Sequence, residues 1–183
     1  MQQNQQKLAI CSLVEVELTH AITQGLNSVF FEASSVRSFA SDAARATFRE
    51  RWLGSYLTLN ITESFLALSS AGEVAGYVIG DLEDPAPNPR YADLGYISAF
   101  AGLTPHYPAH LHMNVALQHR SRGLGQRLID AFAGHARAAR VPGIHVVTGA
   151  GMRNAGFYQR NGFEPLAEAP WNGRSVVMLG RRL

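Results

Sequence analysis

The chain has 183 residues, and 46% of them are hydrophobic, which is enough to bury the core of one domain. It contains no stretch of 18 or more apolar residues, and its polar start does not fit a signal peptide, so we expect neither a membrane span nor secretion. The single cysteine, Cys11, argues against a disulfide framework, and the single lysine, Lys7, argues against a P-loop or a pyridoxal phosphate enzyme. We therefore expect one cytoplasmic domain over residues 1–183, with residues 1–6 disordered.

The net charge of +2 conceals an uneven distribution along the chain. Residues 1–117 carry six basic and eleven acidic groups, a net charge of −5, whereas residues 118–183 carry ten basic and three acidic groups, a net charge of +7. This asymmetry suggests an anionic ligand on the C-terminal part, although arginines that only solvate helix faces would give the same count.

Hydrophobic periodicity and turn residues predict alternating strands and helices. In chain order, we expect a strand over 8–14, helices over 16–31 and 42–53, strands over 65–69, 74–81 and 109–117, a helix over 124–140, a strand over 144–148, a helix over 152–161, and strands over 163–167 and 175–179. Ser41 is a candidate N-cap for the second helix, and Asn172-Gly173 is a strong hairpin turn.

This order predicts an α/β fold with a mixed sheet of about seven strands, flanked by about four helices. The strand, helix, strand unit over 109–149 favours one parallel pair inside a largely antiparallel sheet. Between Asp84 and His110 lies an irregular segment that holds five of the eight prolines and several aromatic residues, so we expect it to be functional.

The most informative segment joins the predicted strand at 109–117 to the helix that follows it. It reads Arg120-Ser-Arg-Gly-Leu-Gly125, so two glycines permit a tight turn just before unpaired helix amides at the positive end of the helix dipole. Such a loop can bind phosphate, although glycines often serve only to turn the chain. A dinucleotide fingerprint fails here, because Leu128 stands where a third glycine is needed.

A second motif follows in Asn154-Ala-Gly-Phe-Tyr158, whose asparagine and tyrosine are four residues apart and hence share a helix face. Together with the glycine loop, it makes residues 109–165 resemble the GNAT superfamily of N-acetyltransferases. Three further segments resemble bacterial GNAT proteins related to the acetyltransferase-like domain of some O-GlcNAc hydrolases, a domain whose own acetyl transfer is in doubt. They are 107–112, 141–145 and 177–183.

The resemblance implies a GNAT-like fold with a splayed parallel strand pair, and acetyl-coenzyme A as cosubstrate. It implies that the amide of Met113 meets the acetyl carbonyl, that Val115 pairs with the pantetheine arm, that Asn154 touches the pantetheine or a water, and that Tyr158 is the general acid. The pyrophosphate is expected on the loop formed by Arg120, Arg122, Gly123, Leu124, Gly125 and Gln126. Tyr158 could instead be a packing tyrosine, and Asn154 a helix cap.

The acceptor amine needs a base, because a lysine-like amine with a pKa of about 10.4 is almost wholly protonated at neutral pH. Many GNAT enzymes use a glutamate on this strand, but here the strand has no carboxylate and offers His110 and His112 on one face. Both histidines could instead be structural, and a metal pair lacks a third ligand, so we expect no metal. Four acids could attract a cationic acceptor or could only solvate a turn: Asp81, Glu83, Asp84 and Asp93.

We therefore expect an N-acetyltransferase that transfers acetyl directly to a primary amine of a small molecule or peptide. The alternative is a non-catalytic module that binds acyl-coenzyme A or only keeps the fold. The sequence lacks GxSxG and HExxH motifs, and its arginines do not alternate with aromatics, which argues against hydrolysis and nucleic-acid binding. We expect a monomer or homodimer.

Overall fold

The computed structural model describes residues 8–183, which form two compact units. The first unit comprises the chain up to Gly80 and residues His112–Phe132, and the second comprises Asp81–Leu111 and Ala133–Leu183. Strand β4, Ala109–Val115, and helix α5, Leu124–Ala138, each run from one unit into the other. The expected disorder of residues 1–6 lies outside the described residues, and the single domain over 1–183 stays a prediction.

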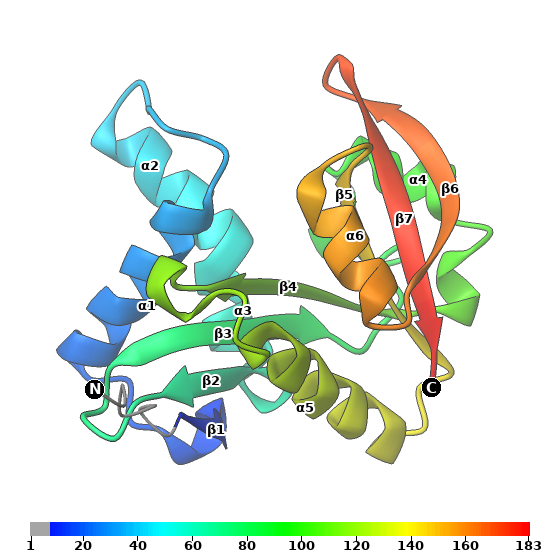
Figure 1. The fold of residues 1–183 in the computed structure, drawn as a ribbon. Coiled ribbons are helices and arrows are strands. Elements are labelled where there is room, and N and C mark those ends of the chain that lie inside the picture. The colour runs from blue at the N-terminus through cyan, green and yellow to red at the C-terminus, as the bar shows by residue number, and fades with distance from the viewer. Residues whose placement is uncertain (1–7) are drawn as a thin grey trace. The chain divides into compact units, whose positions relative to one another are not determined.

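The sheet of the first unit starts with three antiparallel strands (Figure 1). Strand β1, Ala9–Ser12, pairs with β2, Phe65–Leu68, which pairs with β3, Val74–Asp81. The predicted strands over 65–69 and 74–81 thus form a hairpin, and Gly72 in its turn has a positive φ of 78°, which favours glycine. Because β3 is buried along nearly its whole length, other parts of the protein must cover both of its faces.

Three helices belong to the first unit: α1, His20–Ala33; α2, Asp42–Arg49; and α3, Ser55–Leu59. The predicted cap is confirmed, since the hydroxyl of Ser41 accepts a hydrogen bond of 3.1 Å from the amide of Ala44. The predicted start of the first helix at residue 16 is wrong, because Thr19 caps α1. A π-helical turn, Glu50–Gly54, connects α2 to α3 and was not predicted.

The sheet of the second unit contains the parallel pair. The N-terminal half of β4 lies parallel to β5, Gly143–Gly149, and β5 pairs antiparallel with β7, Arg174–Arg182, which pairs antiparallel with β6, Glu164–Trp171. The Asn172-Gly173 turn is confirmed, since both residues have positive φ, 47° and 72°. The hydrogen-bonded order β1-β2-β3-β4-β5-β7-β6 confirms the mixed seven-stranded sheet.

Helices cover both faces of the second sheet (Figure 1). Helix α6, Arg153–Arg160, contacts β5, β6 and β7, and α4, Gly95–Phe100, contacts β6, with the ring of Tyr96 5.1 Å from that of Trp171. The prediction of a wholly irregular segment between residues 84 and 110 is therefore wrong in part, because α4 lies inside it. None of the helices within residues 8–183 is long and apolar enough to cross a membrane.

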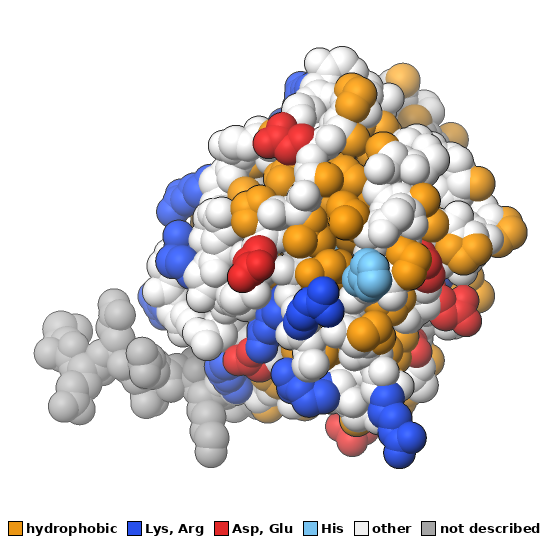
Figure 2. All heavy atoms as spheres, turned by 90° about the vertical axis from the view of Figure 1, so that its right-hand side faces the viewer, with side chains coloured by type: hydrophobic (Ala, Val, Ile, Leu, Met, Phe, Trp, Pro, Cys, Tyr) orange, Lys and Arg blue, Asp and Glu red, His pale blue; other side chains and the backbone are white. Residues whose placement is uncertain are grey.

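Strand β6 forms the outer edge of the second sheet, and its sequence protects that edge. Pro165 and Pro170 have no amide hydrogen to offer to another strand, and the pairing with β7 shifts register between Pro165 and Ala167. Figure 2, which faces the side of the molecule that carries β6 and α4, shows hydrophobic side chains gathered in the middle of this surface. The prolines and the register shift disfavour strand addition there.

Candidate active site

The glycine loop leaves β4 through a turn with two residues in the left-handed region. Ser121 has φ of 59° and Gly123 has φ of 78°, and a non-glycine residue in that region is uncommon. The guanidinium of Arg120 donates a hydrogen bond of 2.9 Å to the carbonyl of Val115 and so ties the turn to the end of β4. These backbone angles and this hydrogen bond together define the conformation of the loop between β4 and α5.

The loop leads directly into the first turn of α5. The carbonyl of Gly123 accepts a hydrogen bond of 3.2 Å from the amide of Arg127, which closes the first turn and leaves the amides before it without helical acceptors. Gln126 and Arg122 are exposed, Gly125 is half-buried and Leu124 is buried. A Cβ atom on Gly123 would have no heavy atom within 4 Å, so the space above the loop is open.

In the first unit, the C-terminal half of β4 carries His112, Met113 and Val115, all half-buried. The ring of His112 lies between two aromatic rings, with centroids 5.4 Å from Trp52 and 5.3 Å from Tyr56, both in edge-on geometry. Trp52 belongs to the π-helical turn and Tyr56 to α3, so this unpredicted turn sets the position of the imidazole.

A second contact in the first unit brings β3 close to β4. The side-chain amide of Asn114 donates a hydrogen bond of 2.6 Å to the hydroxyl of Tyr77, and burial raises the pKa of that hydroxyl. A Cβ atom on Gly76 would lie 2.9 Å from the carbonyl oxygen of Asn114, so only glycine permits this approach. Sequence reasoning missed Tyr77 and Gly76, although a glycine inside a predicted strand is a signal of close backbone approach.

His110 lies in the second unit and is only 8% exposed. Its ring is perpendicular to that of Tyr91, with centroids 4.8 Å apart, and lies 5.6 Å from that of His145. Nδ1 of His145 donates to the carbonyl oxygen of Tyr107, and burial lowers the pKa of His145 to about 4. The two candidate histidines of β4 therefore have different surroundings.

The acidic side chains of Asp81 and Asp84 accept hydrogen bonds from neighbouring parts of the chain. Asp81 is 5% exposed and accepts hydrogen bonds of 2.8 Å from the Tyr91 hydroxyl and 3.0 Å from the amide of Glu83, with Arg90 at 3.4 Å. Asp84 accepts from the amide of Ala86 at 2.9 Å. For Asp81 and Asp84, these contacts favour a structural role over attraction of a cationic acceptor.

Tyr158 and Asn154 lie on α6 in the second unit. Tyr158 is 7% exposed, with its ring 5.5 Å from that of Phe163, and burial raises its pKa to about 12. The side chain of Asn154 exchanges two hydrogen bonds with the hydroxyl of Thr148 on β5, at 2.7 and 2.9 Å. Met152 holds the N-cap position of α6, so the alternative that Asn154 caps this helix is wrong.

Comparison with known families agrees with this arrangement. The family described as Acetyltransferase (GNAT) domain matches residues 62–165, more than half of the chain. The chain belongs to this family. The match includes β4, the glycine loop, α5, β5 and α6 of the GNAT domain.

Solved structures share the GNAT fold over nearly the whole chain. SsHAT is 20% identical with a TM-score of 0.71, and the match covers 96% of this chain and 98% of that one. PH1933 from Pyrococcus horikoshii is 15% identical with a TM-score of 0.68, covering 97% and 99%. A chain of the NatC complex bound to Gag peptide and CoA is 12% identical with a TM-score of 0.61, again covering 97% and 99%. At these identities, the likeness concerns the fold alone.

Metal chemistry has no ready set of ligands in the part of this GNAT domain that the structure describes. Among residues 8–183, no three His, Cys, Asp or Glu side chains lie close enough together to hold a metal ion. His110 and His145 are neighbours, but Nδ1 of His145 is already bonded to the Tyr107 carbonyl.

Proposed function

We propose that this GNAT domain is an acetyl-coenzyme A-dependent N-acetyltransferase that transfers acetyl directly to a primary amine. The observation that carries the proposal is the ordered turn after β4, which leaves the first amides of α5 without helical acceptors, within the region matched by the family. Amides at a helix N-terminus and nearby arginines suit a polyanionic pyrophosphate.

The proposed cosubstrate site uses mainly backbone groups. The amide of Met113 meets the acetyl carbonyl, Val115 pairs with the pantetheine arm, and Asn154 contacts that arm or a water. The pyrophosphate lies on Arg120, Arg122, Gly123, Leu124, Gly125 and Gln126. Because Thr148 holds the side chain of Asn154, that amide is fixed in orientation and can be engaged with little loss of side-chain entropy.

The reaction we propose is a single displacement at the thioester carbonyl. The nitrogen lone pair of the amine attacks the carbonyl carbon, the oxygen gains negative charge that the Met113 amide stabilises, and the carbon–sulfur bond then breaks. The departing thiolate takes the phenolic proton of Tyr158, and the proton lost by the amine goes to His112. Products are the acetylated amine and free coenzyme A.

Burial keeps the hydroxyl of Tyr158 protonated and also makes it a weaker acid. With a pKa of about 12, the phenol is protonated throughout the physiological range. Transfer of its proton to a thiolate with a pKa of about 8.5 is uphill by roughly 3.5 pKa units, or about 5 kcal/mol, unless the thiolate is desolvated as well. The proposed role therefore requires that the same dry surroundings raise the pKa of the leaving group.

We assign the base to His112 in preference to His110. His112 is half-buried and held between Trp52 and Tyr56, so it combines a fixed orientation with access, whereas His110 is 8% exposed and packed against Tyr91 and His145. A base needs to reach the proton it accepts, directly or through one water.

The acceptor is a primary amine of a small molecule or a peptide. The NatC structure is bound to a peptide and CoA, which supports a peptide as one class to test. The relation to the domain of O-GlcNAc hydrolases rests on the three segments 107–112, 141–145 and 177–183 and stays a prediction, as does a monomeric or homodimeric state. A single cysteine fits a reducing compartment such as the cytoplasm.

Thiol release tests the activity. Purified protein is incubated with acetyl-coenzyme A and a panel of small amines and peptide N-termini, and free thiol is measured over time. Amine-dependent release supports the transferase, whereas binding of acetyl-coenzyme A without release across the panel would favour the non-catalytic module.

A pair of glycine variants of α5 tests the loop. Gly125→Leu places a side chain in the first turn and should abolish coenzyme A binding in calorimetry. Gly134→Leu is the matched control, because a Cβ atom there has nothing within 4 Å, and it should bind normally. Retained affinity in Gly125→Leu would contradict the loop assignment.

A further inference from the structure

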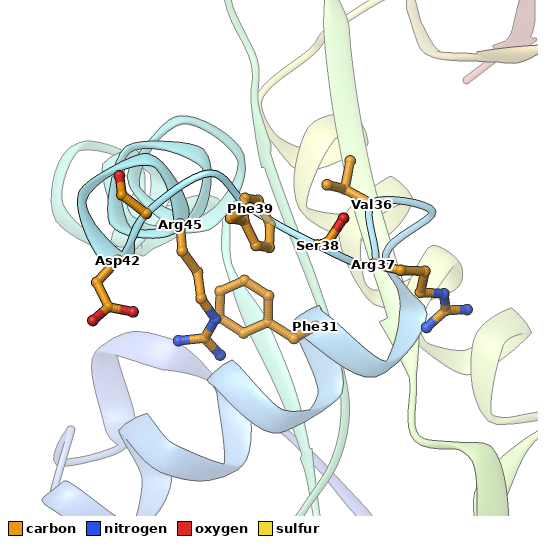
Figure 3. Close-up of a pocket in the computed structure, with 8 residues that line it drawn as sticks. Phe31, Val36, Arg37, Ser38, Phe39, Asp42 and Arg45 are labelled. Atoms are coloured by element: carbon orange, nitrogen blue, oxygen red, sulfur yellow. The ribbon is translucent and has the colours of Figure 1, made fainter.

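A cavity of about 590 Å³ lies in the first unit, and none of the residues assigned above lines it. It is bounded by the end of α1, the connecting segment and the first turns of α2 (Figure 3). Its size falls in the range of small-molecule sites. The lining residues are Phe31, Val36, Arg37, Ser38, Phe39, Ser41, Asp42 and Arg45.

Aromatic rings form the apolar part of the cavity. Phe31 and Phe39 meet edge to face with centroids 6.0 Å apart, and Phe39 packs at 5.3 Å on Phe48 of α2. Phe48 in turn packs at 5.5 Å on the buried Phe30 of α1. The apolar wall is thus anchored in the packing between the two helices and is preformed, which lowers the entropy cost of binding.

Two opposite charges stand beside this wall on one face of α2. The guanidinium of Arg45 lies 3.7 Å over the ring of Phe31, which fixes its plane, and Asp42 is three residues earlier, so the two Cβ atoms are about 5–6 Å apart. Yet, within residues 8–183, neither side chain forms an ion pair with any partner. Figure 3 shows both side chains on the same side of the cavity, whereas Arg37 points away from them.

The ligand has to satisfy both charges and the aromatic wall. A simple anion on Arg45 would be repelled by Asp42, and a simple cation on Asp42 would be repelled by Arg45. A group that carries both charges a few ångströms apart can pair with each, carboxylate on the planar guanidinium and ammonium on the carboxylate. An apolar side chain on the same carbon would then lie on Phe31 and Phe39.

We propose that this cavity binds the zwitterion of a free apolar α-amino acid, with its carboxylate on Arg45, its ammonium on Asp42 and its side chain against Phe31 and Phe39. A peptide terminus carries only one of the two charges and fits less well. This site is independent of the proposed acetyl transfer, since it needs neither the glycine loop nor Tyr158.

The test is calorimetric titration of the full chain with L-phenylalanine, in the absence of acetyl-coenzyme A. We expect saturable binding at one site. N-acetyl-L-phenylalanine lacks the ammonium, L-phenylalaninamide lacks the carboxylate and glycine lacks the apolar body, and each should bind roughly tenfold or more weakly.

Charge-neutralising variants locate the site. Arg45→Gln and Asp42→Asn should each weaken L-phenylalanine binding roughly tenfold or more, and Asp42→Asn should leave the weak binding of N-acetyl-L-phenylalanine unreduced. Arg37→Gln is the matched control, since it removes a charge from the same cavity but from a side chain that points away, and it should bind like wild type. All three positions are exposed, so the melting temperature of each variant should be close to that of the wild type.

Three results would overturn the proposal. One is the absence of saturable binding of L-phenylalanine. The second is equal affinity for L-phenylalanine and its N-acetyl derivative, which would make the site an anion site. The third is an equal loss in the Arg37 and Arg45 variants, which would show a general effect of surface charge.

Discussion

The buried imidazole of His145 should make the stability of the protein fall in mild acid. This side chain is 2% exposed in the second unit, and Nδ1 donates to the carbonyl of Tyr107. Burial lowers its pKa from 6.5 to about 4, and the Tyr107 carbonyl and the carboxylate of Asp84 offset the shift only in part. The folded state therefore holds the neutral form.

The sign and size follow from linkage between protonation and folding. Because the folded-state pKa lies below that of the unfolded chain, the unfolded state binds more protons between pH 6.5 and about 4. The free energy of unfolding is thus fully supported above pH 6.5 and falls as the pH drops through this window. The loss reaches about 2 kcal/mol at pH 5 and approaches about 3 kcal/mol below pH 4, at about 1.36 kcal/mol for each pKa unit.

Urea unfolding of the wild type and of His145→Asn, from pH 4 to pH 8, isolates this contribution. Asparagine keeps a donor near the position of Nδ1 but does not titrate. We expect the variant to be less stable than the wild type at pH 8, and to lose less free energy of unfolding on acidification. The difference in free energy of unfolding between the two proteins should therefore be about 2 kcal/mol smaller at pH 5 than at pH 8. The exposed His106→Asn in the same unit serves as control and should follow the wild type. Parallel curves for wild type and His145→Asn would refute the reasoning.

Three further substitutions test the site and its scaffold. Tyr158→Phe should leave coenzyme A affinity nearly unchanged and lower turnover at least about tenfold, as expected for loss of a general acid; an unaltered rate removes this residue from the mechanism. His112→Gln should lower kcat/KM by about 10²-fold or more and flatten the acid limb of the pH–rate profile, and an unchanged profile would exclude it as the base. Gly76→Ala forces a Cβ to 2.9 Å from the Asn114 carbonyl and should cost about 1–3 kcal/mol in urea unfolding, whereas Gly95→Ala, where that atom meets nothing within 4 Å, should cost far less.

The sequence predicts those parts of the fold that are specified by neighbouring residues. The Ser41 cap and the Asn172-Gly173 turn depend on local hydrogen bonds and on positive φ, so the residues themselves carry the information. The π-helical turn before α3 carries no comparable local signal. Helix α4 was missed because prolines crowd the segment around it, and prolines disfavour a helix only where they stand inside it.

The candidate site can be proposed from the sequence through its backbone motifs, but the side chains that surround its residues cannot. The glycine loop and the α6 motif are short and contiguous, so their residues could be named in advance. The partners of His112 are Trp52 and Tyr56, which are far from it in sequence, and nothing in the pattern of β4 indicates them. The spacing of that pair, four residues apart and hence on one helical face, was the available signal.

The number of charged residues in the sequence overestimates how many charged side chains are available to a ligand, because several of them are bound to other parts of the protein. Asp81 and Asp84 hold their own loops, and Arg120 and Arg127 donate to the carbonyls of Val115 and Leu8. A charge bound to backbone still contributes to the field, but its orientation is already fixed by the fold. Discrimination between acceptors must therefore come from shape and from the placement of single groups such as His112, and a change of net charge alone should alter association rates more than the choice of amine.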